Sequence, residues 1–250
     1  MSSTTDVWII GASKGLGLAI AEEFARDGRP VIGLSRSTPA EQGPFAAFRP
    51  VDVTSGESVE RTVRTLLAER GAPALIVYCA SQLYQGSIAT RDDAELDREL
   101  EVNYLGFVRV ARALAVFKDP AARVRLVATG STLGYVGTPS LDNYSAAKAA
   151  LISFARSSRH ELGALGIDVA IVSPPHMDNG ADLVGPKRYA MSWAAPRFAS
   201  AAAGERAEYL LGASNRSIQQ MTHWAPGLAQ SIMRGIGADA LARGASTVRA

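Results

Sequence analysis

Short apolar runs rich in β-branched residues alternate with longer stretches of helical periodicity along most of this 250-residue chain. A strand, a helix and a second strand in succession form a βαβ unit, whose parallel strands are covered on both faces. The alternation therefore predicts an α/β fold, with a doubly wound parallel sheet of about seven strands and helices on both faces. Strands are expected at Val7–Ile10, Pro30–Leu34, Ala47–Val51, Ala74–Cys79, Val124–Thr129 and Asp168–Val172. Helices are expected at Leu16–Asp27, Ser58–Glu69, Arg91–Phe117 and Tyr144–Leu162.

The alternation weakens after about residue 174. Residues 174–206 mix Pro, Gly, Ala, Trp and charged residues without a clear period, so we expect an irregular, lid-like substrate loop there. Ala207–Leu211 is a candidate seventh strand, and Ser214–Gly235 has helical character. Since no linker divides the chain, we predict a single domain over residues 1–250.

Composition excludes several classes of protein. The chain has 26 basic and 24 acidic residues and a net charge of +2, without the basic excess of a nucleic-acid-binding protein. One cysteine allows no intrachain disulfide or Cys-based zinc cage, and the three histidines lack ligand-like spacing. The N-terminus does not resemble a signal peptide, and no apolar run is long enough to span a membrane. We therefore expect a cytoplasmic protein that holds no metal and binds no nucleic acid.

The first strand leads directly into a glycine-rich turn, Gly11-Ala-Ser-Lys-Gly15-Leu-Gly17, and a helix follows. Gly11 would permit the tight turn, while Gly15 and Gly17 would let the backbone approach a phosphate and the helix pack on the strand. The helix N-terminus offers free N–H groups and the positive end of its dipole to a pyrophosphate. Glycines also serve turns for structural reasons alone, but a strand before and a helix after favour dinucleotide binding.

The end of the second strand bears on the choice between NAD and NADP. NAD-binding domains usually place an acidic residue there for the ribose 2′-hydroxyl, but this segment reads Gly33-Leu-Ser35-Arg36-Ser37. Arg36 could bind a 2′-phosphate, and Lys14 in the glycine-rich turn would add a second cation. Both could instead be solvated surface residues. The missing acid and the two cations together favour NADP(H).

Tyr144 and Lys148 lie four residues apart, on one face of a predicted helix. A tyrosine with an ordinary pKa of about 10 is a poor acid–base group at neutral pH, but an ammonium within about 4–6 Å would lower that pKa. Tyr144 could then protonate an alkoxide or deprotonate an alcohol. Taken alone, the pair is more typical of an amphipathic helix surface. Ser131 places a hydroxyl at the end of the preceding strand, and this context favours a catalytic pair over a surface pair.

Over residues 6–175 the chain resembles the compact branch of the short-chain dehydrogenase/reductase family, which has a Rossmann-like fold. The matching elements are Gly11-x-x-x-Gly15-x-Gly17, Asp52 after the third strand, Asn103 in Asn-Tyr-Leu-Gly, Ser131, and Tyr144-Ser-Ala-Ala-Lys148. They occur in the order and spacing of the family. The extended branch has a differently spaced glycine motif and a longer chain.

The resemblance implies a role for each matching residue. Tyr144 would be the general acid in reduction, Lys148 would lower its pKa and bind the nicotinamide ribose, and Ser131 would hold the substrate oxygen. Asn103 would form a water-linked proton relay with Lys148. The implied cofactor contacts are Gly11, Ser13, Lys14, Gly15, Leu16, Gly17, Arg36, Asp52, Val53, Ala80, Asn103, Tyr144, Lys148, Pro174 and Met177; among these, Asp52 and Val53 would meet the adenine.

The chain departs from the family pattern at three places, of which Gly130 before Ser131, in place of a pair of serines, should matter little. Asn-Asn-Ala-Gly after the fourth strand is replaced by Tyr78-Cys79-Ala80-Ser81. Cys79 cannot make the bonds of the second asparagine as well, so we expect altered scaffolding and an inert core thiol. Pro-Gly after the sixth strand is replaced by Pro174-Pro175, with Asn179 where threonine is common, and the second proline stiffens that loop.

Several further residues have two interpretations each. Tyr135, His176 and Trp193 are expected to contact substrate along with Ser131, although His176 is equally compatible with a solvated loop. Trp193, with Met191 and Phe198, could form an apolar lid or fix the insertion to the body of the protein. His160 is expected at the surface, whereas His223 and Trp224 are expected in core or subunit packing.

The leading functional hypothesis is an NADPH-dependent reductase that converts a ketone or aldehyde to an alcohol. The alternatives are an NADP-dependent alcohol dehydrogenase working in the oxidative direction and a non-catalytic dinucleotide sensor. A sensor would be expected to have lost Tyr144, Lys148 or Ser131, and all three are present. The Ala, Trp and Met residues of the insertion favour a bulky, partly apolar substrate.

The two long helices carry apolar residues beyond the stripe that one sheet requires. These are Val102, Leu105, Val108 and Ala115 on the first, and Ala146, Ala150, Ile152 and Phe154 on the second. The resemblance implies that these helices pair across a two-fold axis into a four-helix bundle, giving a homodimer or homotetramer. In the alternative, residues 214–236 fold over this surface and the protein is a monomer.

Overall fold

The computed structural model describes residues 5–38, 43–178 and 188–242, with side chains up to residue 238. Within them, seven strands form one sheet in the order β3-β2-β1-β4-β5-β6-β7, and every neighbouring pair is parallel. The strands are β1 (Val7–Ile10), β2 (Val31–Ser35), β3 (Ala47–Pro50), β4 (Leu75–Tyr78), β5 (Val124–Thr129), β6 (Ile167–Ser173) and β7 (Glu208–Leu210). The predicted doubly wound α/β fold and its seventh strand are confirmed.

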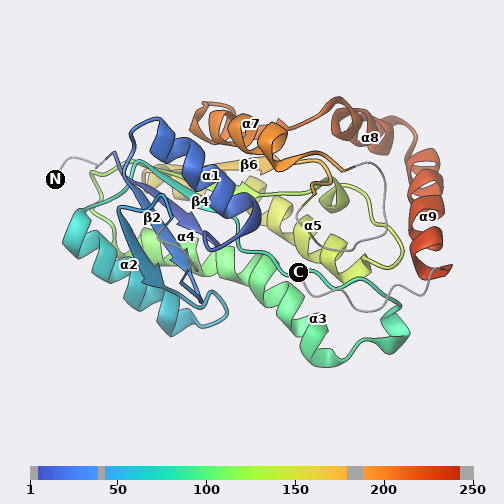
Figure 1. The fold of residues 1–250 in the computed structure, drawn as a ribbon, viewed down its shortest axis with the longest axis horizontal. Coiled ribbons are helices and arrows are strands. Elements are labelled where there is room, and N and C mark those ends of the chain that lie inside the picture. The colour runs from blue at the N-terminus through green and yellow to red at the C-terminus, as the bar shows by residue number, and fades with distance from the viewer. Residues whose placement is uncertain (1–4, 39–42, 179–187, 243–250) are drawn as a thin grey trace.

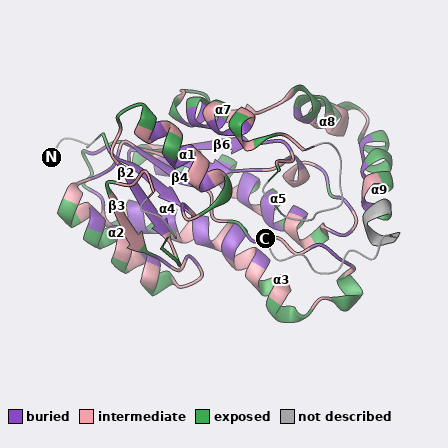
Figure 2. Ribbon diagram, viewed as in Figure 1, coloured by how far each residue is buried: buried purple, intermediate pink, exposed green. Residues whose placement is uncertain are grey.

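Helices cover both faces of this sheet (Figure 1). They are α1 (Gly15–Arg26), α2 (Gly56–Arg70), α3 (Asp93–Leu100), α4 (Gly106–Phe117), α5 (Asp142–Ser157), α6 (Arg159–Ala164), α7 (Met191–Ala203), α8 (Ala213–Trp224) and α9 (Pro226–Ala242). α1 and α7 pack side by side on one face, and α2, α4 and α5 lie on the other. β1 and β4 are buried along their whole length (Figure 2), which explains their continuous apolar sequences.

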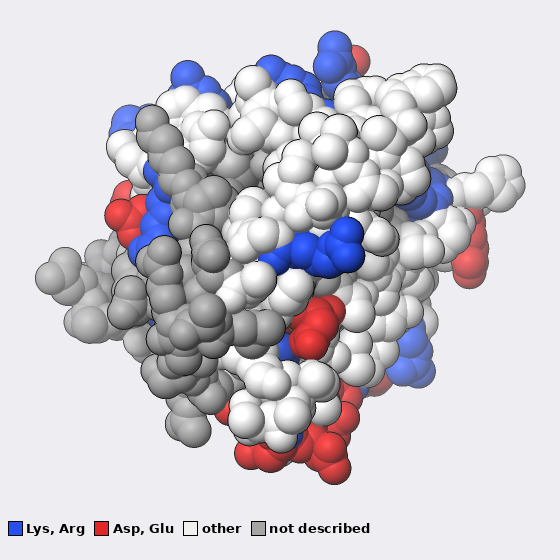
Figure 3. Space-filling model, turned by 90° about the vertical axis from the view of Figure 1, so that its right-hand side faces the viewer, with Lys and Arg blue, Asp and Glu red and all other residues white. Residues whose placement is uncertain are grey.

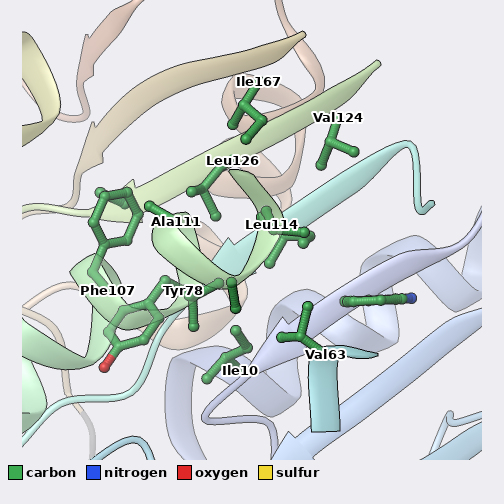
Figure 4. Packing of buried hydrophobic residues seen from close by; sticks show 14 of the residues in the cluster. Ile10, Val63, Tyr78, Phe107, Ala111, Leu114, Val124, Leu126 and Ile167 are labelled. Carbon is green, nitrogen blue, oxygen red and sulfur yellow. The ribbon is translucent and has the colours of Figure 1, made fainter. Parts of the chain in front are cut away.

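Each face of the sheet has its own apolar core. Ile20, Phe24 and Phe198 pack on the α1–α7 face. On the opposite face, Tyr78 and Phe107 meet edge to face with ring centroids 5.7 Å apart (Figure 4). The two cores hold the strand ends in fixed positions, and those strand ends carry the site described below.

The long helix predicted over Arg91–Phe117 contains a π-helical turn, Glu101–Leu105. A π-turn shifts the backbone hydrogen-bond pattern by one residue, and the carbonyl of Val102 accepts the Tyr78 hydroxyl at 2.6 Å. A Cβ at Gly106 would lie 2.1 Å from that hydroxyl oxygen. Tyr78 and Gly106 therefore fit together, and the turn sets the position of Asn103.

Two expectations about helices were wrong. Met191–Ala203 forms α7, where an irregular insertion was expected; Ala194, Ala195 and Phe198 line its buried side, and Pro196 obscured that pattern. The predicted helix Ser214–Gly235 is two helices separated at Ala225, because a residue that precedes a proline avoids the α conformation.

Only some of the apolar residues expected to pair between subunits are exposed. Val102 and Ile152 are buried in the core of their own chain, and the ring of Phe154 packs 6.2 Å from that of Phe107. Ala146 is exposed on α5. Leu105, Val108, Ala115 and Ala150 are partly exposed.

The C-terminal helices α8 and α9 pack against the segment after β5. Thr138 Oγ1 donates to the carbonyl of Met233 at 2.9 Å, and Gly237 lies against Pro139. His223 and Trp224 do not pack in the core of their own chain, since both are exposed, with Trp224 at 77%; packing between subunits stays a prediction for them. His160 is exposed as expected.

The part of the chain that the structure describes contains no helix long and apolar enough to cross a membrane. It also contains no cluster of three or more side chains of the kinds that hold a metal ion.

Candidate active site

A cavity of about 980 Å³ lies at the carboxyl ends of the strands. In doubly wound sheets, ligands bind where the strand order reverses, and here β1 is flanked by β2 on one side and β4 on the other. The predicted residues that line the cavity are Gly11, Ser13, Lys14, Gly15, Leu16, Arg36, Val53, Ala80, Ser131, Tyr144, Lys148, Pro174, His176 and Met177. The structure therefore brings residues from the loops after β1, β2, β3, β4, β5 and β6 to one space.

The three glycines of the turn after β1 differ in what surrounds them. A Cβ at Gly11 would lie 2.5 Å from the backbone nitrogen of Ala80, and one at Gly17 would lie 2.1 Å from the Gly11 carbonyl oxygen. These two glycines allow the turn, β4 and α1 to pack closely. Gly15 has a φ of +57° and nothing within 4 Å of its Cβ position. The open space above Gly15 and the N-terminus of α1 is suited to a phosphate.

Two cations lie at the same end of the cavity. Lys14 and Arg36 are both exposed and both line it. The Asp52 carboxylate lies outside the cavity wall and accepts hydrogen bonds from the Thr54 backbone and hydroxyl at 3.0 and 2.8 Å. Burial would raise the pKa of Asp52, but the bonds from Thr54 and the charges of Arg98 and Arg36 outweigh it and lower that pKa. Of the two residues predicted to meet the adenine, Val53 lines the cavity and Asp52 does not.

Tyr144 faces two hydroxyl groups across the cavity. Burial raises the pKa of Tyr144 to about 12, while hydrogen bonding by Ser81 and Ser131 opposes that rise. The Lys148 ammonium lies 5.6 Å from the centre of the Tyr144 ring. We expected Lys148 to bring the pKa of Tyr144 below its ordinary value, and the structure contradicts this because desolvation dominates.

Lys148 is buried at 1% exposure and donates to the Thr129 carbonyl at 3.0 Å. Burial lowers the pKa of Lys148 to about 8. When a desolvated ammonium lies next to a desolvated phenol, the charge of the ammonium stabilises the phenolate and the charge of the phenolate stabilises the ammonium. The two groups are thus placed for a proton transfer between Tyr144 and a ligand.

Asn103 is fully buried, and the structure puts it outside the cavity wall. Its Nδ2 donates to the carbonyls of Gln82 and Glu99 at 2.6 and 2.9 Å. Its Oδ1 accepts from the Ser81 hydroxyl at 2.8 Å and the Gln82 backbone at 3.4 Å. Asn103 therefore holds the loop after β4, and Ser81 stands between it and Tyr144.

Two predicted substrate contacts do not reach the cavity. The Tyr135 ring packs under the Arg156 guanidinium, 5.5 Å from the ring centre. The Trp193 ring stacks on Tyr189 at 4.6 Å, and Tyr189 lines the cavity in its place. Each aromatic side chain packs elements of the fold together, and neither lines the cavity.

Several residues at the cavity wall were not predicted as site residues. For Ser81, the sequence showed only that a serine replaces the glycine of the family pattern. It did not indicate which side chain Ser81 would contact. The segment after β5 and helices α8 and α9 add apolar residues to the cavity wall, beside polar ones such as Thr138, Ser140 and Asn215. The apolar residues are Leu133, Leu141, Ile218, Met233 and Ile236. Helical spacing places Ile218, Met233 and Ile236 on helices, but it does not show that these helices return to the sheet.

Cys79 also lines the cavity wall. Its sulfur lies 3.4 Å from the Thr129 hydroxyl, and burial raises the pKa of the thiol to about 11. A protonated thiol is a poor nucleophile. The geometry agrees with an inert thiol. Cys79 contacts β5 through its sulfur, at the position where the family pattern has an asparagine amide.

Comparison with known proteins places this arrangement in a family. A 3-oxoacyl-(acyl-carrier-protein) reductase of Escherichia coli is 31% identical over 172 residues, which cover 66% of this chain and 70% of the relative. The corresponding reductase of Mycobacterium avium is 28% identical over 220 residues, covering 83% and 86%. A crystal structure of a short chain dehydrogenase from Burkholderia cenocepacia in complex with NADP has a TM-score of 0.74 at 23% identity. It covers 92% of this chain and 98% of that one, which shows a shared fold.

The sequence profile of the short chain dehydrogenase family matches residues 5–188. That range contains the glycine-rich turn, Ser131, Tyr144 and Lys148. The chain therefore belongs to the short-chain dehydrogenase family of oxidoreductases.

Proposed function

We propose that this protein is an NADPH-dependent reductase that converts a ketone or aldehyde carbonyl to an alcohol. The observation that carries the proposal is the position of Tyr144, Ser131 and Lys148 on the wall of the cavity that also contains the glycine-rich turn. Three side chains able to handle a proton or a developing negative charge thus lie beside a phosphate cradle.

The residues of the cavity fit NADP(H). Gly15 and the N-terminus of α1 would hold the pyrophosphate, and Arg36 and Lys14 would bind the 2′-phosphate. Support comes also from the Burkholderia cenocepacia relative, which was solved with NADP. When bound, NADPH supplies the hydride; everything else in the reaction is done by the chain.

Ser131 and Tyr144 act on the substrate oxygen. The Ser131 hydroxyl donates a hydrogen bond to the carbonyl oxygen and stabilises the negative charge that develops there. Tyr144 donates its proton to the same oxygen, because burial keeps its hydroxyl protonated at neutral pH. Lys148 then stabilises the resulting phenolate through its charge. Run in reverse, the same groups oxidise an alcohol.

The apolar side chains that α8 and α9 add to the cavity wall favour a carbonyl compound with an apolar substituent. Ile218, Met233 and Ile236 line the wall and would remove such a chain or ring from water. The curated relatives reduce a 3-oxoacyl chain, which has this chemistry. We therefore place aliphatic and aryl ketones ahead of small polar ones as substrates.

Steady-state consumption of NADPH with a panel of ketones tests the proposal. Tyr144→Phe removes only the ionisable oxygen, so it should abolish turnover and leave NADPH binding nearly intact. Lys148→Ala should weaken both, and Ser131→Ala should mainly lower kcat. More than about a tenth of the activity remaining in Tyr144→Phe would mean that another acid does the work.

A further inference from the structure

Ser81 is a residue of the cavity wall for which the family resemblance supplies no role, since the pattern has glycine there. Its hydroxyl donates to Asn103 Oδ1 at 2.8 Å, and it lines the same cavity as Tyr144. It is also one of the two hydroxyls that face the Tyr144 oxygen.

The hydrogen bonds of Asn103 fix the direction of the Ser81 proton. Because Asn103 Nδ2 is bound to the carbonyls of Gln82 and Glu99, Oδ1 must be the atom that meets Ser81. A serine hydroxyl has one proton and two acceptor lone pairs. With its proton on Asn103, Ser81 can only accept from Tyr144, which suits the protonated phenol.

The same hydroxyl can serve the ionised state of Tyr144. When Tyr144 has given its proton to the substrate oxygen, rotation about the Ser81 Cβ–Oγ bond turns the proton from Asn103 Oδ1 to the phenolate. Asn103 Oδ1 keeps the Gln82 N–H, so the rotation leaves no buried acceptor without a donor. A hydrogen bond to an anion is also stronger than the neutral one it replaces.

We propose that Ser81 is a second hydroxyl partner of the proton-donating tyrosine, switching its single proton between Asn103 and Tyr144 as Tyr144 ionises. The inference rests on the proposed function, because it gives Ser81 a part in the same proton transfer. No proton leaves Ser81; only the acceptor of its hydrogen bond changes.

The other groups around Tyr144 stay constant when Ser81 is changed. Lys148 lies on the same helix, with the Cys79 thiol beside it. Glu99 on α3 raises the pKa of Tyr144 through its charge, and its carboxylate is held by Arg91 and Asn143. A shift caused by Ser81→Ala is therefore assigned to the lost hydroxyl.

The test is the pH dependence of NADP⁺-linked alcohol oxidation in Ser81→Ala and Ser81→Gly. Oxidation needs the phenolate, and loss of a donor to the phenolate raises the pKa of Tyr144. We expect the acid limb to move up by about one pH unit, with a rate about tenfold lower below its midpoint and near normal above it. Ser81→Thr, which keeps a hydroxyl, should stay within about threefold of the original protein.

Two controls separate the possible failures. Ser200→Ala, on the exposed side of α7, should change nothing. Ultraviolet titration of the NADP⁺ complex, with Tyr144→Phe as the blank, reports the pKa of Tyr144 without turnover. An unshifted midpoint in Ser81→Ala and Ser81→Gly, or an equal loss in Ser81→Thr, overturns the role of Ser81. Absence of turnover in the original protein overturns the proposed function, and the titration still decides the role of Ser81.

Discussion

Arg36 and Lys14 lie exposed at the phosphate end of the cavity. If they bind the 2′-phosphate, NADPH should bind at least about tenfold more tightly than NADH, a difference of about 1.4 kcal/mol. Arg36→Asp should reverse that order, because it removes an attraction and adds a repulsion. Fluorescence titration with both cofactors measures this, with Arg123→Asp at the opposite end of β5 as the matched control. Equal affinities in the original protein would exclude the assignment.

Lys148 makes a second prediction at the residue scale. Its pKa of about 8 in the folded protein lies below the 10.5 of an unperturbed lysine, so the unfolded chain binds more protons between these pH values and stability rises with pH there. Lys148→Met removes the buried charge but also the bond to the Thr129 carbonyl. We expect a net gain of about 1–2 kcal/mol at pH 7. In urea unfolding, the advantage of Lys148→Met should shrink and then reverse as pH rises from 8 to 10.5. A gap that is constant with pH would contradict the buried charge.

Most of the residues predicted for the site line the cavity, but the electrostatics between them could not be predicted. Spacing shows that Tyr144 and Lys148 share a helix face. It does not show how much water reaches them, and desolvation decides the direction of both pKa shifts. Asn103 was predicted from the family motif Asn-Tyr-Leu-Gly, which does not indicate that its amide binds the backbone of the loop after β4.

At the scale of elements, the π-helical turn between α3 and α4 depends on the pairing of Gly106 with Tyr78. Gly106→Ala should destabilise the fold by about 1–3 kcal/mol, because its Cβ would overlap the Tyr78 hydroxyl. Tyr78→Phe alone should also destabilise, since it leaves the Val102 carbonyl without its donor. Unfolding of the double variant should cost less than the sum of the two, by at least about 0.5 kcal/mol. Gly163→Ala, with nothing within 4 Å, is the control, and strict additivity would refute the pairing.

Elements were predictable from sequence wherever the apolar pattern was long and uninterrupted. The strands and the first helices met that condition. α7 did not, because Pro196 interrupts a stripe made mainly of alanines, whose contribution to an apolar pattern is small. The loop after β5 and helices α8 and α9 meet only through tertiary contacts such as Thr138 to Met233. Local sequence contains no trace of such contacts.

At the scale of the whole molecule, we still predict a two-fold oligomer through α4 and α5. The structure changes the residue that tests it, because Phe154 packs against Phe107 in its own chain and a charge there would also damage the fold. Ala146 is exposed on α5, so Ala146→Glu should dissociate the oligomer without unfolding it. Sedimentation at micromolar concentration measures this, with Ala203→Glu as control. A single species near 26.3 kDa for the unchanged chain would refute the prediction.

The face over α9 is mostly free of charged side chains among the residues described (Figure 3), with Leu228 and Ile232 exposed on it. The inner side of the same helix supplies Met233 and Ile236 to the cavity. All of α8 and α9 lies beyond residue 188, where the family match ends. In the proposed reductase, the wall that would meet the substrate's substituent therefore comes from other elements than the side chains that would move the proton. We expect substitutions in these two helices to change which carbonyl compounds are accepted and to leave the proton transfer unchanged.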